Sequence, residues 1–394
     1  MTKLGELVNM TFGNAFKSSE FTDTASDIRL LRGDNIGQGR LRWDGAKRFP
    51  AHRIAEVERY QLEEGDVVIA MDRPWITAGL KYSVVRGRDL PCLLVQRVAR
   101  LRSKAGLDQG YLGAIVGSKA FTDYVIGVQT GSAVPHISGG QIADFELPPL
   151  PPIEVQRAIA GILGTLDDKI ESNHRQRDLL RKLGAARFVN AVTYGGVERP
   201  LGSVTMSIAR GVAPRYADDD EFSAPLVLNQ RCIRDGWVSL APARRAQDRV
   251  VAPAKKASSG DILVNSTGVG TLGRVARWHE GSIFVDSHVS VIKPDVTEVG
   301  PTVLAYAMLA RVPDIEALGE GSTGQTELSP ARLGEFKVLL PDASKMGVLE
   351  DELFGIERCS EQLANENVRL ASVRDALAPE LLSGRIRVPT EEVA

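Results

Sequence analysis

The chain has 394 residues, of which 43% are hydrophobic and 25% are charged, the composition of an ordinary globular protein. These values exclude a fibrous or intrinsically disordered chain and leave room for two or three domains with cores of their own. The formal net charge is −2, so the whole chain lacks the basic character that often accompanies nucleic-acid binding. A nucleic-acid hypothesis must therefore rest on local charge.

Neither the N-terminus nor the cysteines suggest export. The opening sequence MTKLGELVNMTF lacks the apolar run of a secretory signal, and the longest apolar stretch, residues 303–310, is too short to span a bilayer. Cys92, Cys232 and Cys359 lie far apart and form no CxxC pair. We therefore expect a soluble, cytoplasmic protein without disulfides and without a metal site.

Residues 1–148 are predicted to form a first globular domain. Their segments rich in Val, Ile, Leu and Thr are short and are interrupted every few residues by Gly, Asp or Pro. This pattern predicts strands and turns with few helices, in a mostly β or α+β domain. The domain ends in FELPPLPP, which starts at Phe145 and leads directly into a helical stretch.

A long helix is predicted next, within residues 149–196. From Ile153 to Phe188 there is no proline, and apolar residues recur at steps of four and three, which indicates a heptad-like stripe. A helix of about 36 residues extends roughly 50 Å. One DNA turn measures about 34–36 Å, so such a helix is long enough to separate two DNA-binding domains.

Residues 197–341 are predicted to repeat the first domain. The offset between matched positions falls gradually from 197 to 190 residues along the chain, and the order of features is kept. The matched positions are Leu4-Gly5 with Leu201-Gly202, Gly65-Asp66 with Gly260-Asp261, Gly131-Ser132 with Gly321-Ser322, and Phe145 with Phe336. Chance similarity between two α+β segments is the alternative.

Residues 342–388 are predicted to hold the second long helix, and residues 389–394 a short tail. Asn173 follows Ile159 by fourteen residues and Asn367 follows Leu353 by fourteen, so each apolar stripe carries an amide at the same depth. A polar residue in a helix seam fixes its register, and we expect the two helices to form an antiparallel coiled coil. The alternative is that each stripe docks on its own domain. The predicted interface residues are Ile159, Leu163, Leu166, Ile170, Asn173, Leu180, Leu353, Ile356, Leu363, Asn367, Leu370 and Leu377.

Basic residues gather in corresponding parts of the two domains. Between Arg29 and Arg59 eight basic residues accompany four acidic ones, and between Arg210 and Lys256 nine accompany six. Such residues can neutralise phosphates, and Arg, Asn, Ser or Thr on loops can read base edges. A solvated charged surface is the alternative. The candidate DNA-binding residues are Lys17, Arg32, Asn35, Arg40, Arg42, Lys47, Arg48, Arg73, Lys81, Arg210, Arg215, Asn229, Arg231, Arg244, Arg245, Ser266, Thr267, Thr271 and Arg274.

One segment, NSTGVGTLGR from Asn265, contains a formal GxGxxG at Gly268, Gly270 and Gly273. A dinucleotide-binding or S-adenosylmethionine-binding loop must open a helix, whereas the following sequence RVARWHEGSIFV has the character of a strand. We therefore predict a tight turn between two strands.

Sequence motifs of catalysis are absent. The chain has no GxxxxGK[ST], HExxH, GxSxG or NPPY-like motif, and its five histidines are scattered. We expect a protein that is not itself an enzyme.

Three segments together resemble the specificity subunits of type I restriction-modification enzymes. They are LPPLPPIEVQRAIAGILGTLDDKIESNHRQRDLLRKL from Leu147, APELLSGRIRV ending at Val388, and NSTGVGTLGRV from Asn265. The similarity extends over nearly the whole chain. Two features depart from it: the second helix starts LLPDASKMGVLEDEL without a PPIEVQ-like entry, and the first domain has AMDRPWITAGLKY in place of NSTGVGTLG.

The resemblance implies an α+β fold with two target recognition domains, separated by two long helices in an antiparallel coiled coil and related by an approximate two-fold internal repeat. It implies that each domain reads one half of a bipartite, asymmetric site in double-stranded DNA and that the helices set the spacer. Two modification (methyltransferase) subunits would bind, together with motor/endonuclease subunits in the full complex. S-adenosylmethionine, ATP and Mg are expected only on those partners, and no cofactor on this chain.

Two other functions stay open at this point. One is a coiled-coil protein-interaction scaffold without specific DNA readout, in which the basic loops would not share one face. The other is a methyltransferase that uses the glycine-rich loop, and it requires S-adenosylmethionine binding by the isolated chain.

Overall fold

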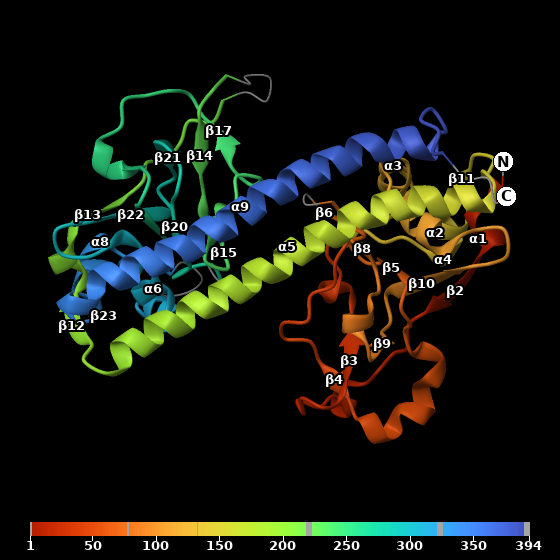
Figure 1. The fold of residues 1–394 in the computed structure, drawn as a ribbon, viewed down its shortest axis with the longest axis horizontal. Coiled ribbons are helices and arrows are strands. Elements are labelled where there is room, and N and C mark those ends of the chain that lie inside the picture. The colour runs from red at the N-terminus through yellow and green to blue at the C-terminus, as the bar shows by residue number, and fades with distance from the viewer. Residues whose placement is uncertain are drawn as a thin grey trace. The chain divides into compact units, whose positions relative to one another are not determined.

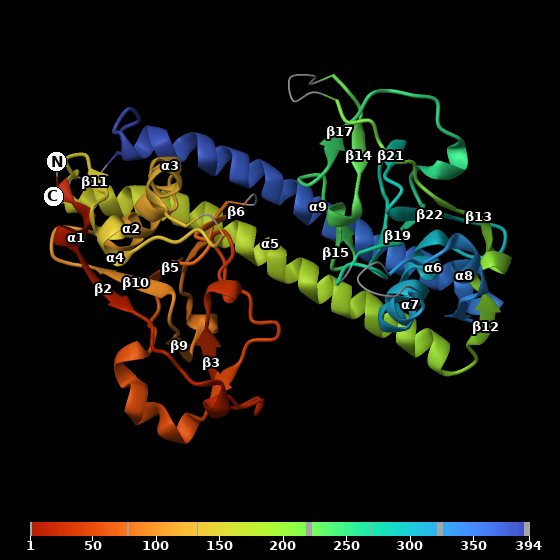
Figure 2. The same ribbon diagram turned by 180° about the vertical axis from the view of Figure 1, so that it is seen from behind.

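The computed structural model describes residues 2–76, 79–131, 133–217, 223–268, 270–320 and 326–389. The chain forms two compact units: unit 1 comprises Met1–His174 with Ala364–Ala394, and unit 2 comprises Arg175–Leu363. Each unit joins a globular α+β part to a segment of both long helices (Figures 1 and 2). The predicted fold class is confirmed. Residues 132, 218–222, 269, 321–325 and 390–394, which include parts of the predicted repeat, glycine turn and tail, lie outside the described residues.

Unit 1 is built on an antiparallel four-stranded sheet of order β2-β10-β5-β8. Its strands are β2 (Val8–Phe12), β5 (Val67–Ala70), β8 (Tyr82–Val84) and β10 (Val98–Ser103). Alternate residues of a strand face opposite sides. Val67 and Ile69 accordingly enter the core beneath the helices, while Val68 and Ala70 enter a second core on the other side. The central strand β5 is thus buried on both faces.

Helices cover one face of this sheet, and a smaller sheet lies on the other (Figure 1). The helices are α2 (Gln109–Val116), α3 (Lys119–Val128) and α4 (Gly139–Ala143). The smaller sheet, here called the distal sheet, has the order β4-β3-β9, and its strands β3 and β9 run parallel. Its strands are β3 (Ile28–Leu31), β4 (Arg48–Phe49) and β9 (Cys92–Leu94).

Short elements complete unit 1. The pair β1 (Thr2–Lys3) and β11 (Glu146–Leu147) closes the globular part next to α1 (Leu4–Leu7), and β6 (Trp75–Ile76) pairs with β7 (Gly79–Leu80). Single-turn 3-10 helices cover Ser18–Glu20, Gly33–Asn35 and Gly87–Asp89, and a longer one covers Ala51–Tyr60.

Unit 2 repeats this plan, with one additional strand, β18, in its distal sheet. Its main sheet has the order β13-β22-β19-β20, and its distal sheet β17-β14-β21-β18 again contains one parallel pair, β14 with β21. The main strands are β13 (Thr205–Arg210), β19 (Ile262–Asn265), β20 (Val275–Arg277) and β22 (Val289–Pro294). The distal strands are β14 (Leu226–Leu228), β17 (Arg244–Arg245), β18 (Lys256–Ala257) and β21 (Ile283–Val285). The internal repeat predicted from the sequence is confirmed.

The remaining elements of unit 2 also have counterparts in unit 1. They are β12 (Val197–Pro200) paired with β23 (Lys337–Leu340), the hairpin β15 (Ile233–Arg234) with β16 (Trp237–Val238), and helices α6 (Pro301–Leu309), α7 (Val312–Ala317) and α8 (Pro330–Glu335). Short 3-10 helices cover Leu201–Val204, Gln230–Cys232 and Pro253–Lys255.

A buried ion pair stands at the same place in both main sheets. Asp66 precedes β5 and accepts from Arg102 of β10 with 2.5 Å between Oδ1 and Nε. Asp261 precedes β19 and pairs with Lys293 of β22. Each carboxylate also accepts from a backbone N–H three residues earlier, at 2.8 Å in both cases. The Asp residues of the two Gly-Asp pairs noticed in the sequence thus stabilise the fold.

The two long helices are α5 (Ile153–Thr193) and α9 (Ala343–Leu382), and within each unit their segments run antiparallel. In unit 1 Asp167 of α5 pairs with Arg374 of α9, and Asn173 of α5 bonds Asn367 of α9. Residue numbers therefore fall along α9 as they rise along α5. The same holds in unit 2, where Arg177 bonds Ser360 and Arg187 pairs with Glu352. No helix among the described residues is long and apolar enough to cross a membrane.

The apolar stripes serve two purposes. Near the ends of the helix pair they enter the domain cores: Ile159 and Leu163 belong to the core of unit 1, and Leu353 to that of unit 2. Ile356 and Leu377 pack at the edges of these cores. Leu166, Ile170, Leu180, Leu363 and Leu370 are half-buried. The two arrangements weighed for the stripes, helix pairing and docking on the own domain, therefore occur together.

Both asparagines of the predicted seam are buried and bonded to each other. Asn173 donates to Asn367 Oδ1 at 2.9 Å, and Asn367 donates to the Ile170 carbonyl at 3.1 Å. A shifted alignment would leave these amides unpaired at a cost of about 1–3 kcal/mol each. This contact explains how the register of the helix pair is specified.

Candidate nucleic-acid interface

Five polar side chains from separate loops of unit 1 lie together beyond the end of β5. We call this group the β5 cluster: Asp72, Arg73, Lys81, Arg97 and His136. Asp72 is its centre, because its Oδ1 lies 2.7 Å from His136 Nδ1 and 3.7 Å from a guanidinium nitrogen of Arg97. Lys81 lies below the surface, and burial lowers the pKa of its ammonium group.

The matching loops of unit 2 hold a group that we call the β19 cluster: Arg210, Gln230, Thr267, His288 and Glu327. Thr267 is its centre, since its hydroxyl lies 2.7 Å from His288 Nδ1 and 3.3 Å from Gln230 Oε1. Arg210 donates to Glu327 at 2.8 Å. The central Thr267 and its neighbour Gln230 carry no charge, whereas the centre of the β5 cluster is a carboxylate, so the two clusters differ in chemistry.

Backbone contacts show that the two clusters occupy equivalent positions. Asp72 forms an isolated β-bridge with His136, and Thr267 forms one with Glu327. The N–H of Met71 donates to the carbonyl of Arg97 at 2.8 Å, and the N–H of Ser266 donates to that of His288 at 2.9 Å. The same scaffold therefore carries two different sets of side chains.

Several predicted residues border these clusters. The Lys81 ammonium lies beside Gly33, so the turn that carries the exposed Arg32 adjoins the β5 cluster. In unit 2 the turn Gln230–Cys232 carries the exposed Arg231 beside the β19 cluster. Both turns thus present an arginine next to the cluster. Arg40 and Arg42 follow the first of these turns, and Arg42 is exposed.

Other predicted residues lie in the distal sheets or in the loops around them. Lys47 pairs with Asp23 at 3.5 Å, and Arg244 stacks over Tyr216 with 3.4 Å between the guanidinium carbon and the ring centroid. The remaining members of this group are Lys17, Arg48, Arg215 and Arg245. Arg48 and Arg245 donate to the carbonyls of Asp27 and Ala224, so these guanidinium groups hold loops together.

Three predicted residues are used by the fold itself. Ser266 is fully buried and its hydroxyl lies 2.6 Å from that of Ser290 on the neighbouring strand. Asn35 accepts from the Arg32 N–H and donates to the Arg42 carbonyl. Asn229 accepts from the Arg231 N–H and donates to the Pro242 carbonyl. Their polar groups are engaged in turns and strand packing, which corrects the expectation that they face a ligand.

The glycine-rich segment is a turn between two antiparallel strands, as predicted, because β19 pairs with β20. Gly268, Gly270 and Gly273 have φ values of 98°, 72° and 80°, a backbone that non-glycine residues rarely adopt. Thr271 donates to carbonyls of the same turn. The segment opens no helix, so it lacks the N-terminal N–H groups that bind a pyrophosphate.

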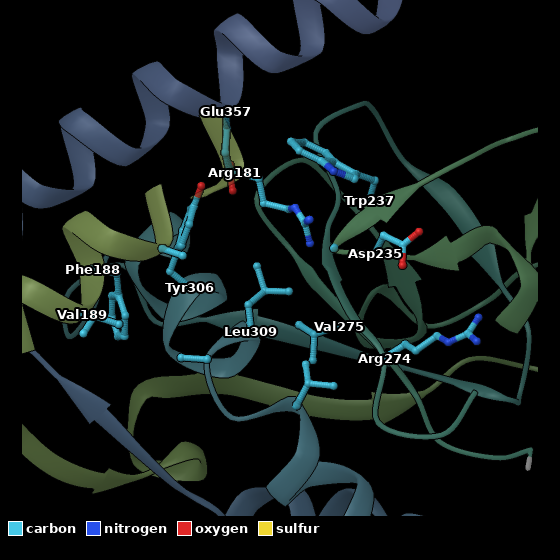
Figure 3. Close-up of a pocket in the computed structure, with 14 residues that line it drawn as sticks. Arg181, Phe188, Val189, Asp235, Trp237, Arg274, Val275, Tyr306, Leu309 and Glu357 are labelled. Atoms are coloured by element: carbon cyan, nitrogen blue, oxygen red, sulfur yellow. The ribbon is translucent and has the colours of Figure 1, made fainter. Parts of the chain in front are cut away.

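Arg274 lies apart from the β19 cluster, on the rim of a groove in unit 2 (Figure 3). The groove has a volume of about 480 Å³ and an apolar floor that includes Phe188, Val275 and Leu309. Arg274 donates to the Gly270 carbonyl at 2.8 Å and extends away from this floor. Arg274 and Thr267, both candidate DNA-binding residues, therefore lie on different parts of unit 2.

An equivalent groove of about 400 Å³ exists in unit 1. Gln38, Tyr82 and Leu163 line it at the places that Asp235, Val275 and Glu357 take in unit 2. Each groove is thus bounded by the globular part of its unit and by both long helices. The duplication extends from the sheets to this surface.

The helix wall of the groove in unit 2 contains a buried ion pair. Glu357 accepts from Arg277 of β20 at 2.6 Å, and the two side chains are 7% and 8% exposed. Burial raises the pKa of Glu357 to about 7, against the opposing effect of Arg277. Burial and the nearby Arg277 lower the pKa of His279 to about 4, so this imidazole is neutral near pH 7. The pair anchors α9 to the main sheet.

Sequence reasoning missed Asp72, Arg97, His136, Gln230, His288 and Glu327. None belongs to a basic run or a motif, and they come from separate loops that only strand pairing brings together. One signal was available: Arg97 and His288 stand just before corresponding strands, β10 and β22, of the predicted repeat.

Comparison with known proteins gives consistent matches. Residues 1–182 match the family model of the type I restriction modification DNA specificity domain. The type I restriction enzyme EcoAI specificity subunit of Escherichia coli is 35% identical over 179 residues, which are 45% of this chain and 29% of that protein. The MjaVIII specificity subunit of Methanocaldococcus jannaschii is 29% identical over 183 residues, 46% of this chain and 42% of that protein. The chain therefore spans less than half the length of these relatives.

The fold also matches a solved structure. The S subunit of a type I restriction-modification system from M. genitalium aligns over 96% of this chain and 94% of that chain, with a TM-score of 0.56 and 16% sequence identity. At this identity the likeness concerns the fold, and it includes both units.

Proposed function

We propose that the chain is a specificity subunit of the type I restriction-modification family, and that it selects the DNA sequence on which such a complex acts. Each unit reads one half of a bipartite site in double-stranded DNA, and α5 and α9 set the spacer between the halves. One observation carries the proposal: the β5 and β19 clusters occupy equivalent places with different chemistry. Two sites that read different base sequences on a duplicated scaffold require equivalent positions with different side chains.

The clusters have the properties of base-reading sites. Their side chains sit on loops held by a rigid sheet, which is where binding residues concentrate. Asp72 and Thr267 fix their neighbours by hydrogen bonds or an ion pair, so little side-chain entropy is lost on binding. Exposed Arg32 and Arg231 beside them can neutralise phosphates and position each unit on the duplex.

The long helices offer surface for partner subunits. Leu179 and Leu183 of α5 and Val368 and Val373 of α9 are large apolar side chains that are exposed. Large apolar side chains exposed on a helix can contact a partner protein. We propose that two modification (methyltransferase) subunits dock along these helices and beside the grooves, and that motor/endonuclease subunits join them. The methyl donor S-adenosylmethionine, and ATP with Mg, then bind those partners, and this chain remains non-catalytic.

The test is to produce the chain together with the methyltransferase subunit encoded beside it and to map methylated bases in the host DNA by single-molecule sequencing. We expect methylation within one split motif, two short defined blocks around an undefined spacer of fixed length. If the complex forms and methylates DNA without a motif, the specificity function is wrong, and a scaffold that only assembles partners becomes the better account.

A further inference from the structure

Position 97 in unit 1 and position 288 in unit 2 are structural counterparts in the turns that lead into β10 and β22. Equivalent backbone hydrogen bonds join each turn to the distal sheet of its unit. The Val95 N–H donates to the Leu31 carbonyl at 3.1 Å, and the Asp286 N–H donates to the Leu228 carbonyl at 2.8 Å. The residue at each position is therefore held at the same place relative to the sheet. The two positions differ in side chain, and Arg97 alone has a positive φ.

The backbone at position 97 is strained. Arg97 has a φ of 67° and Arg73, in the same cluster, a φ of 46°, and Asp235 is the third non-glycine residue with positive φ in the described ranges. Such a conformation costs of order 1–3 kcal/mol and persists only where the surrounding structure enforces it, and such residues cluster at functional sites. Two of the three cases thus meet in the β5 cluster.

The side chain of Arg97 is accessible and oriented. It is 62% exposed, and Asp72, itself 39% exposed, lies on one side of its guanidinium group. Because Asp72 also binds His136 at 2.7 Å, the carboxylate is fixed in place. A guanidinium held by a carboxylate on one side still presents N–H groups to a ligand on the other.

The chemistry of that ligand follows from the donor pattern. An arginine makes two parallel hydrogen bonds to O6 and N7 of guanine, the commonest specific contact in the major groove. A strained, exposed and carboxylate-oriented arginine suits this planar acceptor pair. The counterpart His288 is 55% exposed and bonds neutral Thr267, so unit 2 offers no such pair of donors at this position.

We propose that Arg97 is the specificity-determining residue of unit 1 and reads a guanine edge, and that His288 holds the corresponding reading position of unit 2. This inference rests on the proposed function and predicts that the half-site read by unit 1 contains a guanine. A phosphate oxygen is the other acceptor that a guanidinium binds, and the experiment separates the two.

The experiment compares the wild-type complex with Arg97→Asn and His288→Ala, each produced with the same methyltransferase subunit and mapped by single-molecule sequencing. Asparagine tolerates the left-handed backbone at position 97, so the variant retains the fold. We expect Arg97→Asn to relax discrimination at one guanine of one block by about 10- to 100-fold and to leave the other block unchanged. His288→Ala should affect only the other block. Arg385→Ala, which changes an exposed arginine that also pairs with a carboxylate and lies beyond the end of α9, is the matched control and should change neither block.

The outcomes are distinct. If wild-type protein gives a split motif and Arg97→Asn lowers methylation equally at all sites with the motif intact, Arg97 binds phosphate and the inference is wrong. It is equally wrong if Arg97→Asn relaxes a base other than guanine or a base in the block that His288→Ala affects. If the wild-type complex itself yields no motif, the proposed function has failed before Arg97 is tested.

Discussion

Replacing Arg277 by methionine is expected to lower the free energy of unfolding of unit 2 by about 3–5 kcal/mol, because it strands the buried Glu357 carboxylate. The pKa of Glu357 is already raised to about 7, above its ordinary value of 4.5, so the folded state takes up a proton that the unfolded state lacks between these pH values. Stability linked to this proton is present below pH 4.5 and is lost as pH rises through 7. The deficit of the variant should therefore be larger at pH 8 than at pH 5.

Denaturant unfolding of the whole chain at both pH values measures this effect. The control is the double variant Arg277→Met with Glu357→Leu, which removes both charges and should recover most of the loss. A single variant as stable as the wild-type protein at pH 8 would show that Glu357 is not buried as the structure has it.

Gly13→Ala is expected to destabilise unit 1 by about 3 kcal/mol through overpacking. A Cβ at Gly13 would lie 2.1 Å from the carbonyl carbon and oxygen of Val95, where the end of β2 crosses the turn after β9. The backbone must come this close to Val95 because the Gly13 N–H donates to the Val98 carbonyl and the Asn14 N–H donates to the Leu94 carbonyl, each at 3.0 Å. Any methyl group therefore forces main sheet and distal sheet apart.

The repeat supplies an internal duplicate of this experiment. Gly211 in unit 2 would place its Cβ 2.1 Å from the Val285 carbonyl oxygen, so Gly211→Ala should cost a similar amount. Gly161→Ala is the control, since Gly161 lies inside α5 with open space around its Cβ position, and it should stabilise by about 0.5–1 kcal/mol. Thermal unfolding of the three variants is the measurement, and equal melting of Gly13→Ala and wild-type protein would contradict the close crossing.

Much of the architecture could be predicted, because the residues that mark turns between strands are recognisable in short stretches of sequence. Gly65-Asp66 and Gly260-Asp261 mark the same turn in each unit, and the carboxylates they supply form the matched ion pairs. The long helices were visible from their stripes. Helix α6 was not, because seven of its nine residues are buried and it therefore shows no amphipathic period.

The clusters could not be predicted, because their members meet only through long-range pairing. Asp72 and His136 are 64 residues apart and touch through an isolated bridge, and Arg97 reaches them from the turn before β10. Strand pairing also explains why Ser266 lies outside the cluster. The sequence suggests a polar loop residue, but the pairing places its hydroxyl against that of Ser290. Residue type indicated the chemistry, while the register of the sheet decided which side chains are exposed.

The central claim is that each unit reads its own half of a split site. The most direct test exchanges residues 1–148 for the corresponding domain of a specificity subunit with a different target and maps methylated bases produced by the resulting complex. The account predicts that one block of the motif changes while the other block stays as in the wild-type protein. A motif that changes in both blocks, or in neither, would contradict the assignment of one half-site to each unit.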